Sequence, residues 1–543
     1  MIAFLKTVLT GITLVAVSAC SPPPGDAQER YSVLIINGTV YDGSLEPAHN
    51  TNIGISGDRI VSMDASPDAT ADLVIDAAGR TVVPGFIDPH THAENDLLDD
   101  ASKANINYLT QGVTTVYVGN DGRGLPDLED KLAIMKRQGI GSNVAFFTGH
   151  GTAREETLGL EDRAPTDEEL EQMREFVAND MRAGALGLST GLFYRPGSYA
   201  ETDEVIELAK IAAEFGGVYD SHMRDESSYN IGLLGAVKEV IEIGEKADIP
   251  VHIAHLKALG RDVWGQSGDI IALIDAARER GVEITADQYP WRASGTSLSS
   301  SLIPRWVMAD SEQAMFERLA NPDLEDRIRE EMEANLWRRG GDESLLITGE
   351  SAWRGMTLGE IAERMNLDPI DAAVEVVRGG DPTIASFNMN PDDIDALAIQ
   401  PWVMTGSDGS GGHPRKYASY PKAYQDMVVT KSLFSMQHFV HRSTGLVADF
   451  FYLCDRGYLR PGLKADIAII DLDNFRPVAD FEHPTELSTG ISDLLVNGKL
   501  AIRDSQYTGV LSGTVVNRQR LECPDQAATN SAAQASLIAY KQS

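Results

Sequence analysis

The feature that most constrains the fold is a regular alternation of short apolar runs with longer amphipathic segments, which continues from His92 to Tyr289. The longer segments carry apolar residues at helical spacing, as Leu170, Met173 and Val177 show. Repeated strand–helix units imply a parallel sheet, and this many of them favour a closed barrel over an open doubly wound sheet. No GxGxxG or Walker-type phosphate loop follows any of the runs, which counts against a nucleotide-binding fold.

The expected strands and helices of this α/β unit alternate along the chain. Strands are expected at residues 113–118, 143–147, 185–189, 218–222, 249–255 and 282–288. Helices are expected at residues 99–109, 127–137, 167–183, 202–215, 233–247 and 269–280. Together these units predict a (β/α)8 TIM-like barrel that spans residues 84–449.

The alternation stops after Tyr289. Residues 290–400 are too many for one strand-to-helix connection and hold charged helical segments. We interpret part of this stretch as an insertion after the seventh strand that can act as a lid over the barrel mouth. The barrel pattern returns with a strand at 401–407 and a helix at 422–434.

Both ends of the chain carry short runs typical of β-strands. YSVLIINGTV at 31–40 and ADIAIIDL at 465–472 are examples. The simplest arrangement pairs residues 31–83 with residues 450–518 in one small β-sandwich domain, from which the barrel projects. Residues 519–543 are expected to form a C-terminal tail.

The N-terminus is typical of a secretory signal, because Lys6 precedes an apolar stretch at 8–19 that is too short to span a membrane. The sequence Val17-Ser18-Ala19-Cys20 resembles a bacterial lipobox. This resemblance implies that residues 1–19 are removed, that Cys20 is lipidated and that residues 20–30 are a flexible tether. Ser21 in place of Asp implies sorting to the outer membrane, where the protein would face the periplasm. A plain cleaved signal or an uncleaved anchor is the alternative.

The charge balance limits the classes of partner. The chain has 46 basic and 81 acidic residues, which give a formal charge of −35. Nucleic acid and an anionic membrane surface are therefore excluded as expected partners, apart from an N-terminal lipid anchor. A small-molecule substrate is the partner that remains.

Residues suited to metal binding follow several of the expected strands. His90 and His92 end the first strand, and because side chains alternate along a strand both point to the same face. A histidine or an aspartate also ends four more strands. The full set is His90, His92, Asp121, His222, His255 and Asp408. Since the carboxyl ends of barrel strands meet at one mouth, these six side chains are expected to form one site for Zn²⁺ or a similar metal. Taken singly, a histidine here is more often a hydrogen-bonded core residue, and Asp408 can be a turn residue.

An ordered set of sequence motifs adds a family resemblance. The motifs are PGFIDPHTH at 84–92, GALGLSTGLFYRPG at 184–197, SHMRDE at 221–226, HIAHLKALG at 252–260, DQYPW at 287–291, GSDG at 406–409, HPRKYASYP at 413–421 and GYLRPGLKADIAIIDLD at 457–473. Over residues 31–518 the chain resembles the amidohydrolase superfamily, and within it the N-acyl-D-amino-acid deacylase (D-aminoacylase) branch.

The resemblance implies a set of metal ligands and a mechanism. It implies ligation by His90, His92, His222, His255 and Asp408, with metal-bound hydroxide attacking an amide and Asp408 acting as general base and then general acid. In D-aminoacylases a Cys ligates metal where this chain has Asp121. A carboxylate is a harder ligand that can bridge two metals, so one ion or two remain open.

The resemblance also implies the substrate. Lys257, Tyr289 and Arg415 align with positions that contact a substrate carrying a free carboxylate, which Arg binds bidentately. The expected reaction is hydrolysis of N-acyl-D-amino acids or of D-configured dipeptide-like compounds. His150 can shape the pocket or be structural.

Two alternatives stay open at this point. The first is a cyclic amidase of the hydantoinase or dihydroorotase kind, although these enzymes usually use a carboxylated lysine and only Lys257 lies near a strand end. The second is a non-catalytic envelope lipoprotein that binds ligands on a degenerate enzyme scaffold.

Overall fold

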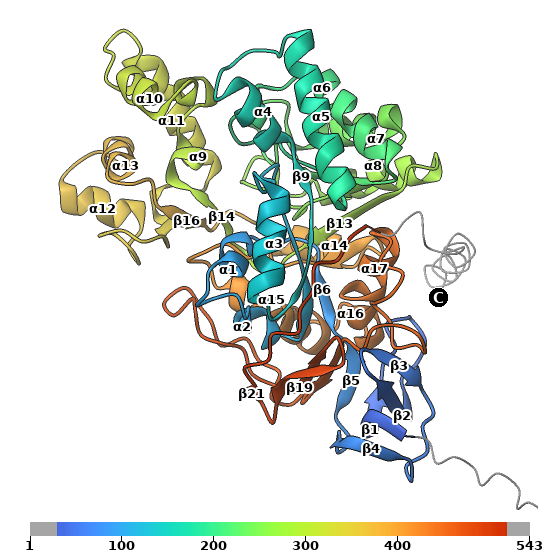
Figure 1. Ribbon diagram of the computed structural model, residues 1–543. Coiled ribbons are helices and arrows are strands. Elements are labelled where there is room, and N and C mark those ends of the chain that lie inside the picture. The colour runs from blue at the N-terminus through green and yellow to red at the C-terminus, as the bar shows by residue number, and fades with distance from the viewer. Residues whose placement is uncertain (1–29, 519–543) are drawn as a thin grey trace, which may run out of the picture.

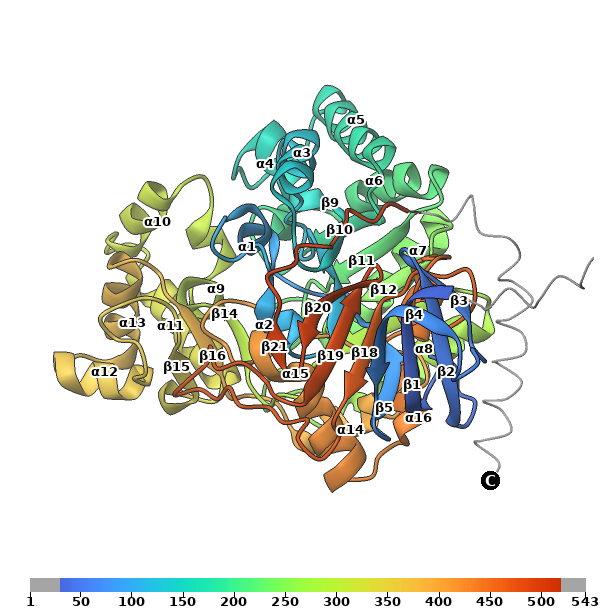
Figure 2. The same ribbon diagram turned by 60° about the horizontal axis from the view of Figure 1, so that its bottom comes forward.

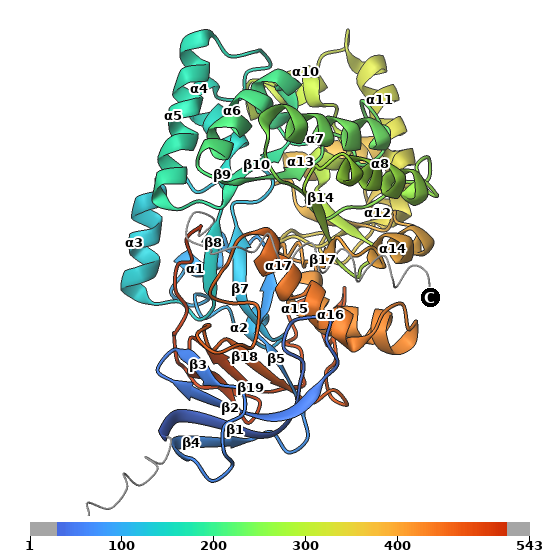
Figure 3. The same cartoon turned by 90° about the vertical axis from the view of Figure 1, so that its right-hand side faces the viewer.

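The computed structural model of the protein describes residues 30–518. A sheet built from the two ends of the chain lies at one end of the molecule, and helices of the barrel lie at the other (Figure 3). A separate group of helices and short strands projects beside the barrel (Figure 1). Within residues 30–518, no helix combines the length and the apolar character that crossing a membrane requires.

The two ends of the chain share one nine-stranded sheet, in which β5 and β18 join the N-terminal to the C-terminal strands (Figure 2). The pairing order is β21-β20-β19-β18-β5-β1-β2-β3, with β4 paired to β1. The nine strands are β1 Arg30–Val40, β2 His49–Ser56, β3 Arg59–Ser62, β4 Thr70–Asp76, β5 Thr81–Pro84, β18 Ile467–Ile470, β19 Ile491–Val496, β20 Lys499–Arg503 and β21 Gln506–Tyr507. All residues of β5 and β18 are buried, so the junction of the two ends lies within the core.

The central unit is the predicted parallel barrel. Its strands are β6 Phe86–Asp88, β7 Val113–Val118, β8 Asn143–Phe146, β9 Thr148–Gly149, β10 Gly187–Gly191, β11 Val218–His222, β12 Val251–Ile253, β13 Ile284–Gln288 and β17 Val403–Thr405. One sheet has the order β6-β7-β8 and the other β9-β10-β11-β12-β13-β17, and only Phe147 separates β8 from β9. The amide of Asp408 donates to the carbonyl of His90 over 2.9 Å, which links the segment after β17 to the segment after β6. The predicted TIM-like fold is confirmed.

Most helices of the barrel lie where the sequence predicts them. They are α1 Glu94–Leu98, α2 Ile106–Leu109, α3 Leu128–Gln138, α4 His150–Leu158, α5 Asp167–Ala183, α6 Thr202–Glu214, α7 Leu233–Ala247, α8 Ser267–Glu279, α14 Pro391–Ala398, α15 Arg415–Ala423, α16 Met436–Arg442 and α17 Gly445–Phe450. The bounds of helix α5 could be predicted because both ends carry local signals. Thr166 and Glu169 form a reciprocal capping box at its start, and Gly184 ends it in the left-handed conformation.

Two helix predictions were wrong. Of the helix expected at 99–109, only α2, Ile106–Leu109, is helical, and α1, Glu94–Leu98, ends just before the expected start. The Asp99 carboxylate accepts hydrogen bonds from the amides of Ala101 and Ser102 and holds a turn between the two helices. The helix expected at 422–434 begins earlier, at Arg415, and continues as a π-helical segment, Tyr424–Thr430. Pro421 lies inside this helix and has no amide hydrogen, and a wider turn follows it.

The insertion lies between β13 and β17, after the seventh strand as predicted. It holds α9 Leu298–Leu302, α10 Glu312–Leu319, α11 Glu325–Arg338, α12 Leu358–Met365 and α13 Pro369–Arg378. A three-stranded antiparallel sheet joins these helices to the barrel and comprises β14 Ser294–Ser297, β15 Leu345–Ile347 and β16 Thr383–Ser386. The insertion has an apolar core of its own, which includes Leu298, Met332 and Ile361. It can therefore keep its shape while it contacts the barrel mouth.

Candidate metal centre

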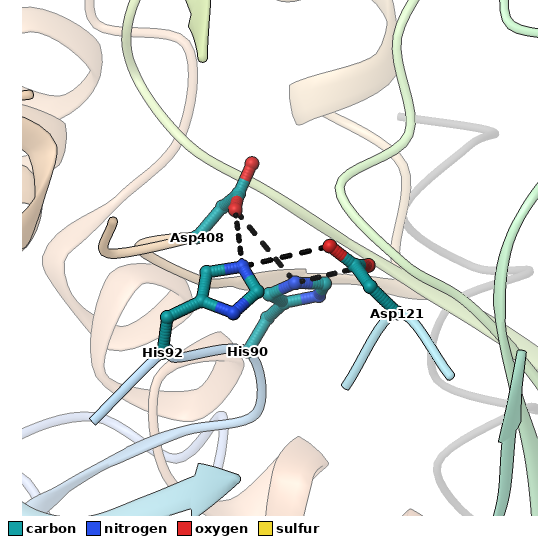
Figure 4. A group of neighbouring side chains, drawn as sticks. All are labelled: His90, His92, Asp121 and Asp408. Atoms are coloured by element: carbon teal, nitrogen blue, oxygen red, sulfur yellow. Dashed lines mark hydrogen bonds and ion pairs between the residues drawn. The ribbon is translucent and has the colours of Figure 1, made fainter. Parts of the chain in front are cut away.

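The structure brings all six predicted metal-binding side chains together at the mouth of the barrel. His90 and His92 follow β6, Asp121 follows β7, and His222 ends β11. His255 follows β12 and Asp408 follows β17. They form two overlapping groups with the geometry to hold a metal ion: His90, His92, Asp121 and Asp408 make the first group, and Asp121, His222 and His255 make the second. Figure 4 shows the first group, with both imidazoles facing the two carboxylates.

The donor atoms are spaced as ligands around a small ion. His92 Nε2 lies 3.2 Å from Asp408 Oδ1 and 3.5 Å from Asp121 Oδ2 (Figure 4). Asp121 Oδ1 lies 3.3 Å from His222 Nδ1 and 3.4 Å from His255 Nε2. Tetrahedral ligands at zinc distances stand about 3.3–3.5 Å from one another, which agrees with these separations. Asp121 thus stands between the two groups and offers an oxygen to each.

Several of these atoms have no hydrogen-bond partner within residues 30–518. His90 Nε2, Asp121 Oδ1 and His222 Nδ1 are all buried and make no hydrogen bond in this part of the chain. Burying a polar atom without a partner costs about 1–3 kcal/mol, so such atoms are rare unless a ligand satisfies them. Imidazole and carboxylate donors are the ligand types that zinc and similar ions take in proteins. The residues present therefore fit a metal ion.

The pKa shifts of the site residues fall into two sets. Although burial opposes it, nearby carboxylates raise the pKa of His92 and raise that of His255 to about 10, so a metal would displace a proton from these two rings. The shifts of His90, His222 and Asp121 favour metal binding directly. Burial lowers the pKa of His90 to about 4 and also lowers the pKa of His222, so both rings are neutral at pH 7 and keep a free lone pair. Burial alone would raise the pKa of Asp121, but the His222 and His90 rings hold it well below its usual range. Neutral imidazoles beside an ionised carboxylate are the forms that ligate metals.

Three of the six residues have an unusual backbone. Asp121, His255 and Asp408 have positive φ angles of 57°, 37° and 47°. This left-handed region is costly for residues with a side chain and is concentrated at functional sites. Each of the three follows the end of a barrel strand, where the turn aims the side chain at the others.

Two carboxylates that support the site were missed by the sequence analysis. Glu226 Oε1 lies 3.1 Å from His255 Nδ1 and 2.5 Å from Lys257 Nζ. Asp287 accepts a hydrogen bond from the amide of His255 over 2.9 Å and lies 3.2 Å from His252 Nε2. Such contacts orient metal-binding histidines. Both residues fall inside the motifs SHMRDE and DQYPW, so the signal was present but did not show what they touch.

The candidate centre opens into a cavity of about 640 Å³. Lys257, Tyr289 and Arg415, the three residues expected to contact the substrate, all line this cavity. Arg415 is buried, places Nη1 2.7 Å from Asp408 Oδ2 and packs its guanidinium 4.8 Å from the Tyr289 ring centre. Residues of the insertion, among them Ser294, also line the cavity, which agrees with its interpretation as a lid.

His150 lies elsewhere. Its Nε2 is 2.8 Å from Glu204 Oε1, and Arg154 shares the same carboxylate. His150 does not line the cavity of the candidate centre, so its structural interpretation holds within the described residues.

Comparisons with known proteins agree with this geometry. Residues 73–502 match the sequence profile of the family described as "Amidohydrolase family". D-aminoacylase of Alcaligenes xylosoxydans xylosoxydans is 31% identical over 529 residues, which cover 90% of this chain and 98% of the relative.

Two solved structures have similar folds. The first is a D-aminoacylase whose structure was solved to define the role of its binuclear metal center. Its TM-score is 0.77 at 31% identity, and the match covers 90% of this chain and 100% of the D-aminoacylase chain. The second is N-acyl-D-glutamate deacylase from Bordetella bronchiseptica, complexed with zinc and a phosphonate inhibitor that mimics the tetrahedral intermediate. Its TM-score is 0.78 at 29% identity, and it covers 90% of this chain and 100% of its own.

Proposed function

Because this chain belongs to the amidohydrolase family, we propose that it is a metal-dependent deacylase that hydrolyses the amide bond of N-acyl-D-amino acids. The observation that carries the proposal is the convergence of four histidines and two aspartates from five strand ends beside a cavity lined by Lys257 and Arg415. Two relatives that are 31% and 32% identical to this chain are named D-aminoacylase and N-acyl-D-glutamate deacylase. Both names refer to D-amino acids, which supports the D configuration.

The metal is proposed to be zinc, as one ion or two. His90, His92, Asp121 and Asp408 would hold one ion, and Asp121, His222 and His255 would hold another. When bound, such an ion activates water and polarises the amide carbonyl. The histidine and carboxylate donor set and the zinc complex of the Bordetella relative support this choice.

Asp408 is proposed to move the proton. Burial would raise the pKa of Asp408, but Arg415 and His255 lower it, so the carboxylate is ionised at neutral pH and can accept a proton. Its position between His92 and the cavity suits a group that takes a proton from the attacking water and passes it to the leaving nitrogen. Arg415 fixes the orientation of the carboxylate through Oδ2.

The remaining polar groups would hold the substrate. Lys257 and Arg415 supply positive charge in the cavity, and the buried hydroxyl of Tyr289 has no hydrogen-bond partner among the described residues. A substrate carboxylate is the group that satisfies these donors. Because the three side chains are fixed in place, they would orient the amide bond toward Asp408.

A cyclic amidase is less well supported. The place between the two groups is taken by Asp121, whereas the ammonium of Lys257 contacts Glu226 and lies 2.9 Å from His255 Nδ1, on the ring edge away from Asp121. Lys257 would have to leave both partners to act as a bridging carboxylated lysine. A non-catalytic binding protein would have no need of a paired Asp408 and Arg415 beside a metal centre.

The first experiment compares matched N-acetyl-D- and N-acetyl-L-amino acids with the full-length chain purified in detergent, with bound metal quantified on the same sample. We expect turnover of the D series and at least about 100-fold lower kcat/KM for the L series, because fixed polar groups reject a substrate that leaves them unpaired. Metal content without hydrolysis of any linear substrate would contradict the proposal, and ring opening of a hydantoin would then favour the cyclic amidase.

We also propose that the protein is a lipoprotein of the cell envelope, anchored through Cys20 and facing the periplasm. The support is the sequence alone, since the signal and tether lie outside the described residues. Incorporation of labelled palmitate by the natural chain and its loss in Cys20→Ser are the expected results. Equal labelling of both chains, or labelling of neither, would show that Cys20 is not the anchor.

A further inference from the structure

One basic side chain of the cavity differs from the others. Four Lys and Arg residues that line the cavity are almost fully buried: Lys257, Arg339, Arg415 and Lys416. Lys257 pairs with Glu226, Arg415 with Asp408, and Lys416 with Asp96.

Arg339 is the exception. It is 2% exposed and forms no ion pair with any carboxylate in the range 30–518. A guanidinium is always charged, and a buried charge without a counter-ion is costly.

The neighbours of Arg339 hold it in place but do not neutralise it. Nε donates to the Tyr229 hydroxyl over 2.6 Å, and Nη1 donates to Ser294 Oγ over 3.4 Å. Nη2 makes no hydrogen bond to another described residue. The charge is therefore oriented by neutral groups, with donors left for a ligand.

A second arginine makes this region more positive. Two guanidiniums contact the Phe193 ring: that of Arg305 lies 4.1 Å from the ring centre, and that of Arg339 lies 5.8 Å from it. Burial and the Arg339 charge lower the pKa of Arg305 to about 10. Two neighbouring cations without a carboxylate raise the local potential, and an anion placed there would lower it.

This region lies close to the candidate metal centre. Phe193 also stacks on the His222 ring, with 5.8 Å between the ring centres. Along β14, Ser294 contacts Arg339, and a side chain at the next residue, Gly295, would come within 2.9 Å of Arg415 Nη2. Ser294, Gly295 and both guanidiniums line the same cavity, so a single substrate can reach Arg339 and Arg415.

We propose that Arg339, presented by the insertion, binds a second carboxylate of the substrate, so that the enzyme prefers dianionic substrates. The second carboxylate belongs either to an acidic D-amino-acid side chain or to a dicarboxylic acyl group, and both have the same chemistry. The inference rests on the proposed deacylase function and names the substrate class that this site takes. Ser294 and Tyr229 position the Arg339 fork, and Arg415 with Lys257 binds the first carboxylate.

The test uses two pairs of substrates that differ only in charge, with the metal-loaded full-length chain. The pairs are N-acetyl-D-glutamate with N-acetyl-D-glutamine, and N-succinyl-D-alanine with N-succinamoyl-D-alanine. We expect the anionic member of at least one pair to have a kcat/KM at least about tenfold higher, and the pair that shows it identifies which end carries the carboxylate. Equal kcat/KM values within both pairs would overturn the inference.

Variants then assign the preference. Arg339→Gln is expected to remove the preference for the anionic substrate. Arg339→Lys is expected to keep part of this preference, since lysine retains the charge but lacks the paired N–H donors of the guanidinium. Arg354→Gln is the control, because Arg354 belongs to the same insertion, pairs with Glu350 at the surface and does not line the cavity. An equal loss for charged and neutral substrates in Arg339→Gln would mean that Arg339 is only structural.

A binding measurement keeps this test separate from the proposed function. D-glutamate is expected to raise Tm more than D-glutamine does in the natural chain and in Arg354→Gln, but not in Arg339→Gln. If no substrate is hydrolysed, the deacylase proposal fails while this difference still supports the anion site. If D-glutamate and D-glutamine shift Tm equally, and succinate and succinamate also do so, the anion site fails whether or not the enzyme is active.

Discussion

Asp408→Asn is expected to lower kcat/KM for an N-acyl-D-amino acid by about 1,000-fold, because an amide cannot accept and return the proton that hydrolysis requires. Bound metal should fall only in part. Asp408 belongs to the first group of donors, whereas Asp121, His222 and His255 form a group without it. The measurements are steady-state kinetics and metal content on the same preparation.

The same substitution is expected to destabilise the fold. Arg415 is 1% exposed, and its Nη1 lies 2.7 Å from Asp408 Oδ2. Removing the carboxylate leaves a buried cation without a counter-charge, which costs about 3–5 kcal/mol of unfolding free energy. Adding Arg415→Gln to Asp408→Asn should recover part of that stability but none of the activity.

A surface change serves as the control for both effects. Asp426→Asn breaks a partly exposed ion pair with Lys422 and is expected to change stability by less than about 1 kcal/mol and to leave the kinetics unaltered. Substantial turnover by Asp408→Asn would refute the role of Asp408 as the proton carrier. If the natural chain binds substrates without hydrolysing them and Asp408→Asn binds them as tightly, the protein is a binding protein.

The six metal-binding candidates could be read from the sequence because they depend on local signals. Each candidate follows an apolar strand. A barrel brings the carboxyl ends of its strands together regardless of the conformation of the loops. Local signals also fixed Leu233–Ala247 and Val218–His222, which lie at the predicted residues. In these segments helical or strand periodicity and tertiary burial favour the same structure.

Contacts that depend on distant parts of the chain could not be predicted. Glu226 follows His222 by four residues, yet its contact with Lys257 arises only when β11 and β12 lie side by side. Arg339 belongs to the insertion, and its place in the cavity depends on the pairing of β14 with β16. The expected helix at 99–109 failed for a related reason, since the side chain of Asp99 competes with the helix for backbone amides.

Asp121→Ala is expected to weaken metal binding in both groups at once, by at least about 100-fold, since even residues behind a ligand contribute 10- to 100-fold. Asp121 Oδ1 faces His222 and His255 and also lies 3.5 Å from His90 Nε2, and Oδ2 faces His92. No other residue of the two groups belongs to both. Metal retained after dialysis and metal titrations on the full-length chain give the measurement.

Asp121→Cys tests the same position with a softer donor. A thiolate sulfur can bridge two ions as a carboxylate can, but it favours softer metals. We expect Asp121→Cys to keep metal in both groups and to bind soft ions such as Cd²⁺ more tightly, relative to zinc, than the natural chain does. Asp127→Asn, an exposed change a few residues along the same loop, should leave metal content unaltered. A natural metal content in Asp121→Ala would show that the carboxylate is not shared, and loss of metal from both groups in Asp121→Cys would show that the site requires a carboxylate at this position.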